Sequence, residues 1–219
     1  MAYAHGGRNR LTLRDLPRFP GETLFDRVAR AVCRAGCLPR KELYESWEVA
    51  RRARRRFRGG RVVDVACGHG LVAQLMLLLD DTSPSALAID PAVPASAGKL
   101  AAELAQTWPR LAGRVTFASA PLAELALAPD DVVVSVHACG TLTDDVLAAA
   151  LAARARVAVL PCCHVIAASP LSGWVEATLA VDLARAHRLI AAGYAVTTQT
   201  IDPAITPKNR LLLGDPRAG

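Results

Sequence analysis

Short apolar segments alternate with helix-like segments from residue 60 to the end of the chain. The apolar segments are four to seven residues long and are flanked by glycine, proline or aspartate, which is typical of buried strands in a parallel sheet. The predicted strands are Val62–Ala66, Ala86–Asp90, Arg114–Ala118, Asp131–Val136, Val157–Leu160, Ala195–Ile201 and Arg210–Leu213. The predicted helices between them are Leu71–Leu79, Ala95–Trp108, a short one at Leu122–Leu127, Thr143–Ala153 and Gly173–Ala192, the longest. This alternation predicts an α/β domain with a seven-stranded, mainly parallel sheet and helices on both faces.

The first 58 residues have a different pattern. Apolar residues recur at helical spacing in Thr23–Ala35 and Lys41–Phe57, which predicts a small helical N-terminal extension. We expect the first ten or so residues to be disordered, because they are polar and terminal. Gly59 and Gly60 mark the predicted junction between this extension, residues 1–58, and a second domain, residues 59–219.

The strongest local signal is the segment RVVDVACGHG, residues 61–70. A buried strand runs into a glycine turn and then directly into an apolar helix, which is the opening unit of nucleotide-binding, Rossmann-like α/β domains. Glycine lets the backbone turn sharply and lets a ligand approach where a Cβ would collide. The next predicted strand ends in Asp90, 20 residues beyond Gly70. A carboxylate at this spacing accepts hydrogen bonds from a ribose diol.

Two ligand classes fit this pattern, dinucleotides and S-adenosylmethionine. Ala73 stands where the third glycine of the phosphate-binding G-x-G-x-x-G pattern belongs. Asp64 precedes the turn, where a carboxylate would repel a pyrophosphate but suits the cationic end of S-adenosylmethionine. The segment resembles motif I of class I S-adenosylmethionine-dependent methyltransferases, with Ala66 in place of the first glycine. The resemblance implies S-adenosylmethionine as cofactor and, as cofactor-binding residues, Asp64, Ala66, Cys67, Gly68, His69, Gly70, Asp90, Ser119 and His137.

Two further segments follow the fourth and fifth predicted strands. They are HACGTLTD, residues 137–144, and PCCH, residues 161–164. Ligands bind outside the carboxyl ends of parallel strands, so we expect these segments to converge beside the methyl donor. Together they resemble signatures of the tRNA acceptor-stem 2′-O-methyltransferases and of related methyltransferase-like proteins. Leu142 departs from that pattern, and the Cys/His zinc modules that precede the catalytic domain of the tRNA enzymes are missing.

The polar residues of these segments are the candidate catalytic groups. They are His137, Asp144, Cys162, Cys163 and His164. A neutral imidazole of His137 or His164 can accept a proton near pH 7. Asp144 either takes part in catalysis or interacts with the amides at the start of its helix. The two cysteines either pack in the interior, contact the substrate or ligate a metal. Their spacing fits no standard zinc module, so we assign no metal.

The charge, the cysteines and the lengths of the apolar segments limit the possible partners and the location of the protein. The net charge is +6, and six arginines occur within Arg51–Arg58, which is either a solvated helix end or a phosphate-binding patch near the cofactor mouth. The six cysteines contain no CxxC pair and indicate reduced thiols. No segment has the ~18 unbroken apolar residues of a membrane span, and the N-terminus lacks the apolar run of a secretory signal. We therefore expect a cytoplasmic protein without a membrane partner.

The sequence thus predicts an S-adenosylmethionine-dependent methyltransferase that modifies an oxygen or nitrogen atom. RNA, bound through Arg51–Arg58, is the favoured acceptor, and a small molecule or a protein side chain is the alternative. Two further hypotheses are a non-catalytic cofactor-binding module and a protein that binds metal through its Cys/His cluster. The sequence pattern leaves the oligomeric state open.

Overall fold

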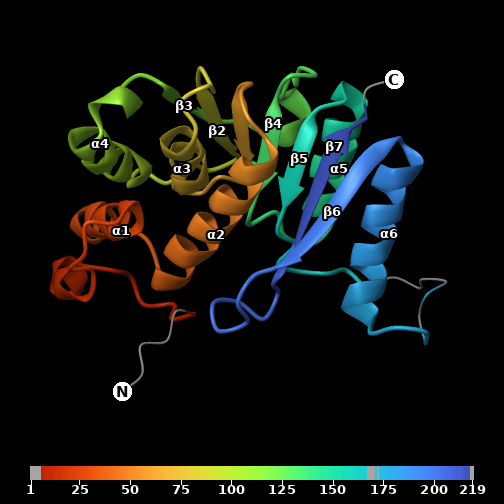
Figure 1. Ribbon diagram of the computed structural model, residues 1–219, viewed down its shortest axis with the longest axis horizontal. Coiled ribbons are helices and arrows are strands. Elements are labelled where there is room, and N and C mark those ends of the chain that lie inside the picture. The colour runs from red at the N-terminus through yellow and green to blue at the C-terminus, as the bar shows by residue number, and fades with distance from the viewer. Residues whose placement is uncertain (1–5, 167–170, 172, 218–219) are drawn as a thin grey trace.

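The computed structural model describes residues 6–166, 171 and 173–217 and contains one seven-stranded sheet (Figure 1). The strands are β1 (Val62–Val65), β2 (Ala86–Asp90), β3 (Val115–Ser119), β4 (Val132–Ser135), β5 (Arg156–Val159), β6 (Tyr194–Thr200) and β7 (Arg210–Pro216). Their order in the sheet is β3-β2-β1-β4-β5-β7-β6. Strands β1 to β5 pair in parallel, whereas β7 is antiparallel to both β5 and β6.

The helices lie on both faces of this sheet. They are α1 (Leu24–Ala35), α2 (Arg40–Arg56), α3 (Leu71–Leu79), α4 (Ala97–Thr107), α5 (Leu142–Ala153) and α6 (Ala177–Ala191), with 3-10 turns η1 (Leu13–Arg18), η2 (Pro109–Leu111) and η3 (Leu122–Glu124). Helices α1 to α4 share one buried core with one face of the sheet, and α5 and α6 share a second core with the other face. In the described part of the chain, no helix combines the length and apolarity that crossing a bilayer requires.

Side chains alternate between these two cores along β1. Val62 packs into the core with α1 to α4, whereas Val63 and Val65 pack into the core with α5 and α6. This alternation is the period-two geometry of a strand. Asp64 points to the same face as Val62, where it accepts a hydrogen bond from an amide of α3. The strand therefore presents one carboxylate to an otherwise apolar layer.

The predicted α/β class, the seven strands and the mainly parallel pairing are confirmed. Two helix predictions were wrong in extent. The segment predicted as a helix at Leu122–Leu127 contains only the single turn η3. Helix α6 begins at Ala177 instead of Gly173, because the Glu176 carboxylate caps it by accepting hydrogen bonds from the amides of Thr178 and Leu179. As a result α2, with 17 residues, is longer than α6, with 15.

The N-terminal segment packs closely against the rest of the chain. Helix α1 contacts α4 and α2 contacts α3, and their buried residues belong to one core. Residues 1–5, half of the segment predicted to be disordered, lie outside the described residues. Within residues 6–10 the Gly7 carbonyl accepts from the Lys41 amide and the Asn9 carbonyl accepts from the Arg40 amide, both at 3.0 Å. The division of the chain into domains at residue 59 stays a prediction.

Candidate functional site

A cavity of about 310 Å³ opens at the carboxyl ends of β1, β2 and β4. Seven of the nine predicted cofactor-binding residues line it: Asp64, Ala66, Cys67, Gly68, His69, Asp90 and His137. We call this cavity the β1–β4 pocket. Its position agrees with the rule that ligands of open parallel sheets bind beyond the carboxyl ends of the strands.

The turn after β1 has a left-handed backbone at three alternate residues, Ala66, Gly68 and Gly70. A Cβ added to Gly68 would meet nothing within 4 Å, so this glycine leaves its backbone open to the pocket. A Cβ added to Gly70 would lie 2.6 Å from the ring of Phe117. Gly70 is therefore required for packing, and it does not line the pocket. Ala66 has a φ of 56° where motif I carries glycine, and this conformation costs about 1–2 kcal/mol for an L-residue.

Asp90 is oriented by backbone amides. Its Oδ2 accepts from the Gly68 amide at 3.1 Å, and its Oδ1 accepts from the Ala92 amide at 3.0 Å. Each carboxylate oxygen can accept further hydrogen bonds, because it carries two lone pairs. The geometry therefore suits the predicted contact with a ribose diol.

Asp64 is buried, and only one of its carboxylate oxygens is satisfied. Its Oδ2 accepts from the Ala73 amide at 3.0 Å, whereas its Oδ1 has no hydrogen-bond partner among the described residues. Burial raises the pKa of Asp64 to about 7, and the nearby Asp90 charge adds to this effect. A buried, unsatisfied carboxylate oxygen is costly. A cationic ligand group in the β1–β4 pocket would offset that cost, so the residues present fit the cationic end of S-adenosylmethionine.

Three residues near the start of α2 form a wall of the pocket that the sequence did not predict. They are Leu38, Glu42 and Ser46. Burial raises the pKa of Glu42, with the neighbouring Glu45 adding to the rise. The pocket thus contains three carboxylates, on Glu42, Asp64 and Asp90, and would repel a pyrophosphate. The only signal in the sequence was an acidic residue in a helical segment, because its place at the pocket depends on how α2 packs against α3.

The polar residue predicted after the third strand lies elsewhere. Ser119 is exposed at the end of β3 and does not line the β1–β4 pocket. Its contact with the cofactor stays a prediction.

His137 is the one predicted catalytic residue that lines the β1–β4 pocket. It follows β4, and it faces the start of α2 closely enough for the charges of Glu45 and Lys41 to act on it. Burial is the largest influence and lowers the pKa of His137, and Lys41 lowers it further against the opposing effect of Glu45. The imidazole is therefore neutral near pH 7 and able to accept a proton.

Asp144 and His164 are held by α6. The Asp144 carboxylate accepts two hydrogen bonds from buried Arg185, at 3.0 and 2.8 Å. The His164 side chain is 3% exposed, and its Nε2 lies 2.7 Å from Asp182 Oδ1. Asp182 also pairs with Arg210 of β7 at 3.0 Å. This network positions α6 against the sheet. Neither Asp144 nor His164 lines the β1–β4 pocket, and their catalytic roles stay a prediction.

The cysteines after β4 and β5 do converge. Cys139 Sγ lies 2.8 Å from Cys162 Sγ, which lies 3.8 Å from Cys163 Sγ. Cys139 and Cys163 are exposed, and Cys162 is half-buried. Burial and the two neighbouring thiols raise the pKa of Cys162. The predicted convergence of the two segments is thus present at their cysteines.

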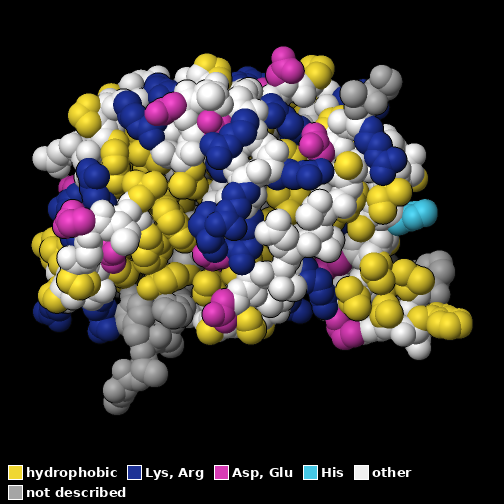
Figure 2. Space-filling view, in the orientation of Figure 1, with side chains coloured by type: hydrophobic (Ala, Val, Ile, Leu, Met, Phe, Trp, Pro, Cys, Tyr) yellow, Lys and Arg dark blue, Asp and Glu magenta, His cyan; other side chains and the backbone are white. Residues whose placement is uncertain are grey.

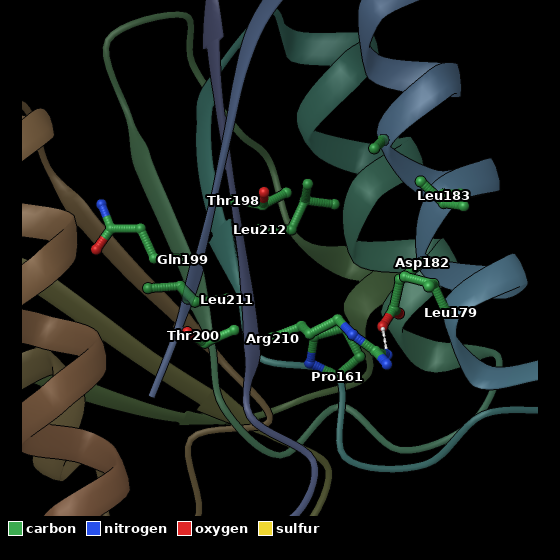
Figure 3. Close-up of a pocket in the computed structure, with 11 residues that line it drawn as sticks. Pro161, Leu179, Asp182, Leu183, Thr198, Gln199, Thr200, Arg210, Leu211 and Leu212 are labelled. Atoms are coloured by element: carbon green, nitrogen blue, oxygen red, sulfur yellow. Dashed lines mark hydrogen bonds and ion pairs between the residues drawn. The ribbon is translucent and has the colours of Figure 1, made fainter. Parts of the chain in front are cut away.

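A second, more apolar cavity of about 470 Å³ lies between α6 and the strands β6 and β7, beside Pro161 (Figure 3). We call it the α6–β7 pocket. Leu179 and Leu183 come from α6, and Thr198 and Leu212 come from the sheet. The ion pair between Arg210 and Asp182 crosses its lower end in Figure 3. The pocket therefore offers an apolar volume with one charged pair, next to the PCCH segment.

The arginine run leads away from the β1–β4 pocket along α2, and Arg52 donates to the Thr200 carbonyl at the end of β6. Glu42 in the first turn of α2 lines the pocket, whereas Arg55 in the last turn is 13 residues further on, about 20 Å along a helix. Ser46, five residues before Arg51, also lines the pocket, so a phosphate-binding patch near the cofactor mouth stays a prediction for the first arginines of the run. Figure 2 shows Lys and Arg side chains gathered over α2 with acidic groups beside them. Glu48, Asp80 and Asp215 pair with five of the six arginines, and Arg54 is buried. Three carboxylates leave a surplus of positive charge on this surface.

Residues 41–168, more than half of the chain, match the family model described as a methyltransferase domain. No curated protein has a significantly similar sequence.

Solved structures show the same fold at low identity. An O-methyltransferase family protein from Burkholderia thailandensis has 19% identity and a TM-score of 0.53, over 94% of this chain and 63% of that protein. A ribosomal protein L11 methylase from Lactobacillus delbrueckii subsp. bulgaricus has 13% identity and a TM-score of 0.52, over 80% of this chain and 77% of that protein. A tRNA methyltransferase from B. subtilis has 12% identity and a TM-score of 0.50, over 78% of this chain and 66% of that protein. The chain thus spans less than two thirds of the Burkholderia protein, and the shared fold occurs in proteins named for different acceptors.

Proposed function

The chain belongs to the methyltransferase-domain family, and we propose that it is an S-adenosylmethionine-dependent methyltransferase that methylates an oxygen or nitrogen atom. The observation that carries this proposal is the unsatisfied Oδ1 of buried Asp64 in a pocket that also contains Glu42 and Asp90. A positively charged ligand is favoured there, and the two phosphates of a dinucleotide are disfavoured.

Five residues of the β1–β4 pocket have a role in this proposal. Asp64 and Glu42 hold the cationic end of the ligand, and Asp90 accepts hydrogen bonds from its ribose. Gly68 leaves the backbone open to the ligand. Bound S-adenosylmethionine supplies a methyl group on a positively charged sulfur. Neutral His137 accepts the proton that a hydroxyl or amine acceptor loses.

Changing Asp64 to Asn tests the cofactor assignment. We expect the native protein to bind S-adenosylhomocysteine and not NAD in calorimetry. Asp64→Asn should weaken S-adenosylhomocysteine binding by about 1.5–3 kcal/mol, the contribution of hydrogen bonds to charged groups. The ionised carboxylate binds the ligand, so native affinity should rise from pH 5.5 to 7.5, through the raised pKa of about 7. The variant should show no such rise.

A second buried carboxylate provides the matched control. Asp131 is 2% exposed and pairs with Arg61 at 2.7 Å, away from the pocket. Asp131→Asn should lose about 1–3 kcal/mol of folding stability with unchanged ligand affinity. Asp64→Asn should keep or gain stability at pH 8. The reason is that a raised pKa makes the ionised native state less stable as pH rises from about 4 to 7. Equal affinities for native and Asp64→Asn protein would place the cationic end elsewhere.

RNA is the acceptor that we propose first. The support is the resemblance of HACGTLTD and PCCH to the tRNA acceptor-stem 2′-O-methyltransferases, together with the surplus positive charge on α2. Along α2, Arg51 is about 8 Å and Arg55 about 14 Å from Ser46, which lines the β1–β4 pocket, so an RNA bound to these arginines would have to extend over that distance. The α6–β7 pocket supports a second candidate, a small molecule with an apolar or aromatic group.

Incubation with methyl-labelled S-adenosylmethionine distinguishes these acceptors. Separated RNA, protein and small-molecule extracts serve as substrates, and we expect label in RNA. Arg51→Gln with Arg55→Gln should then reduce the salt dependence of labelling without changing S-adenosylhomocysteine affinity. Buried Arg54 must stay, because it pairs with Asp80 and donates hydrogen bonds to the Met76 carbonyl and the Ser83 hydroxyl. Label in the small-molecule fraction would favour the α6–β7 pocket, and cofactor binding without any labelling would favour a non-catalytic module.

A further inference from the structure

Three cysteine sulfurs form a compact group at the edge of the sheet where the strands end. The Sγ atoms of Cys139, Cys162 and Cys163 all lie within 4.8 Å of one another. Strands β4 and β5 pair in parallel, with Ser135 opposite Val159. The residues that follow these strands are therefore held side by side by the sheet itself.

Packing does not account for this group. The other three cysteines, at positions 33, 37 and 67, are buried, as expected for thiols that fill a core. Cys139 and Cys163 are exposed, and Cys162 is half-buried. Three partly exposed sulfurs drawn together from two loops need a physical cause other than removal from water.

A tetrahedral ion provides that cause. Zn–S bonds of about 2.3 Å in tetrahedral geometry place pairs of sulfurs about 3.8 Å apart, the distance between Cys162 Sγ and Cys163 Sγ. Cys139 Sγ, 2.8 Å from Cys162 Sγ, would move outward by about 1 Å to meet the same geometry. Thiolates are soft ligands that select zinc over magnesium, calcium or manganese.

We propose that Cys139, Cys162 and Cys163 bind one Zn²⁺ ion, with the fourth coordination position open. Among the described residues, no imidazole or carboxylate joins the three sulfurs. His164 lies outside the group, because neither of its ring nitrogens is within 4.8 Å of all three sulfurs. Three protein ligands with an open fourth position are typical of zinc sites that bind water or substrate. Cys139 is two residues after His137, which lines the β1–β4 pocket.

Metal analysis of the full chain tests this site without acceptor or cofactor. We expect purified protein, prepared without chelator, to contain one zinc per chain by elemental mass spectrometry. Replacement by Co²⁺ should give a thiolate-to-cobalt absorption band and the visible bands of tetrahedral cobalt. Cys139→Ser and Cys163→Ser should each lower metal occupancy several-fold. Cys37→Ser, at a buried thiol in the connection between α1 and α2, should keep it. The far-ultraviolet circular dichroism spectrum would confirm that each variant is folded.

Three results would overturn the proposal. One is protein that contains no zinc and gives no cobalt spectrum while its three thiols react as free groups. A second is a Cys139–Cys162 disulfide in the purified protein, seen as the loss of two hydrogens in the intact mass. A third is unchanged zinc content in both serine variants. Because metal content is measured directly, a failure of the methyltransferase proposal would leave this result interpretable.

Discussion

Replacing Gly60 by Ala should destabilise the protein by about 2–5 kcal/mol, combining overpacking with left-handed strain. Gly60 has a φ of +71°, and a Cβ there would overlap the carbonyl oxygen of Asp130. That carbonyl also accepts a hydrogen bond from Arg156 Nη2 at 2.6 Å. The backbone before β4 would have to shift away from β1. The free energy of unfolding, measured in urea, reports the loss.

A variant at Gly59 serves as the control, because it separates the cost of left-handed backbone strain from the cost of steric overlap. Gly59 has a φ of +64°, but a Cβ there would meet only Thr82 Oγ1, at 3.9 Å. Gly59→Ala should therefore show the conformational cost alone, about 1–2 kcal/mol. Equal losses in the two variants would mean that the contact between Gly60 and Asp130 adds nothing to stability.

Replacing His137 by Asn should slow methyl transfer by about 10²–10⁴-fold, the usual contribution of a general base. The measurement is the initial rate of labelling in the extract fraction that accepts the methyl group. S-Adenosylhomocysteine affinity should change less than tenfold, because Asp64 and Asp90 remain. A rate within a few-fold of the native value would mean that another group accepts the proton.

The pH profile gives an independent readout of the same residue. His137 acts as a base only when neutral, and burial lowers its pKa from 6.5. With S-adenosylmethionine kept saturating at every pH, so that the titration of Asp64 does not limit the rate, native activity should therefore be retained down to a pH below 6.5 and be lost as pH falls further. His137→Asn should lack this acidic limb. His187→Asn, at an exposed position on α6, should keep both the rate and the limb.

Local patterns were sufficient to predict most of the fold. Apolar strands such as Val132–Ser135 are stable only when both faces of their sheet are covered by other elements. The alternation of strands and helices therefore predicted a layered α/β domain. The turn at Gly68 and the carboxylate of Asp90 could also be predicted from the sequence. Both belong to consecutive β–turn–α units, in which chain connectivity alone brings the residues together.

The tertiary structure alone decided which side chains meet. Glu42 and Ser46 reach the β1–β4 pocket because α2 packs on α3, whereas Arg55, further along the same helix, does not line it. Asp144 and His164 are of residue types that can act in catalysis. In the structure they contact Arg185 and Asp182 of α6, which the sequence did not predict.

The three cysteines show most clearly that the sequence alone does not predict which side chains meet. No standard ligand spacing connects Cys139 with Cys162 and Cys163, so the sequence indicated no metal site. Adjacent parallel strands place the residues that follow them at one edge, however many residues separate them in the chain. Sequence periodicity records which face of an element is buried. The identity of the neighbour on that face is determined only when the layers pack.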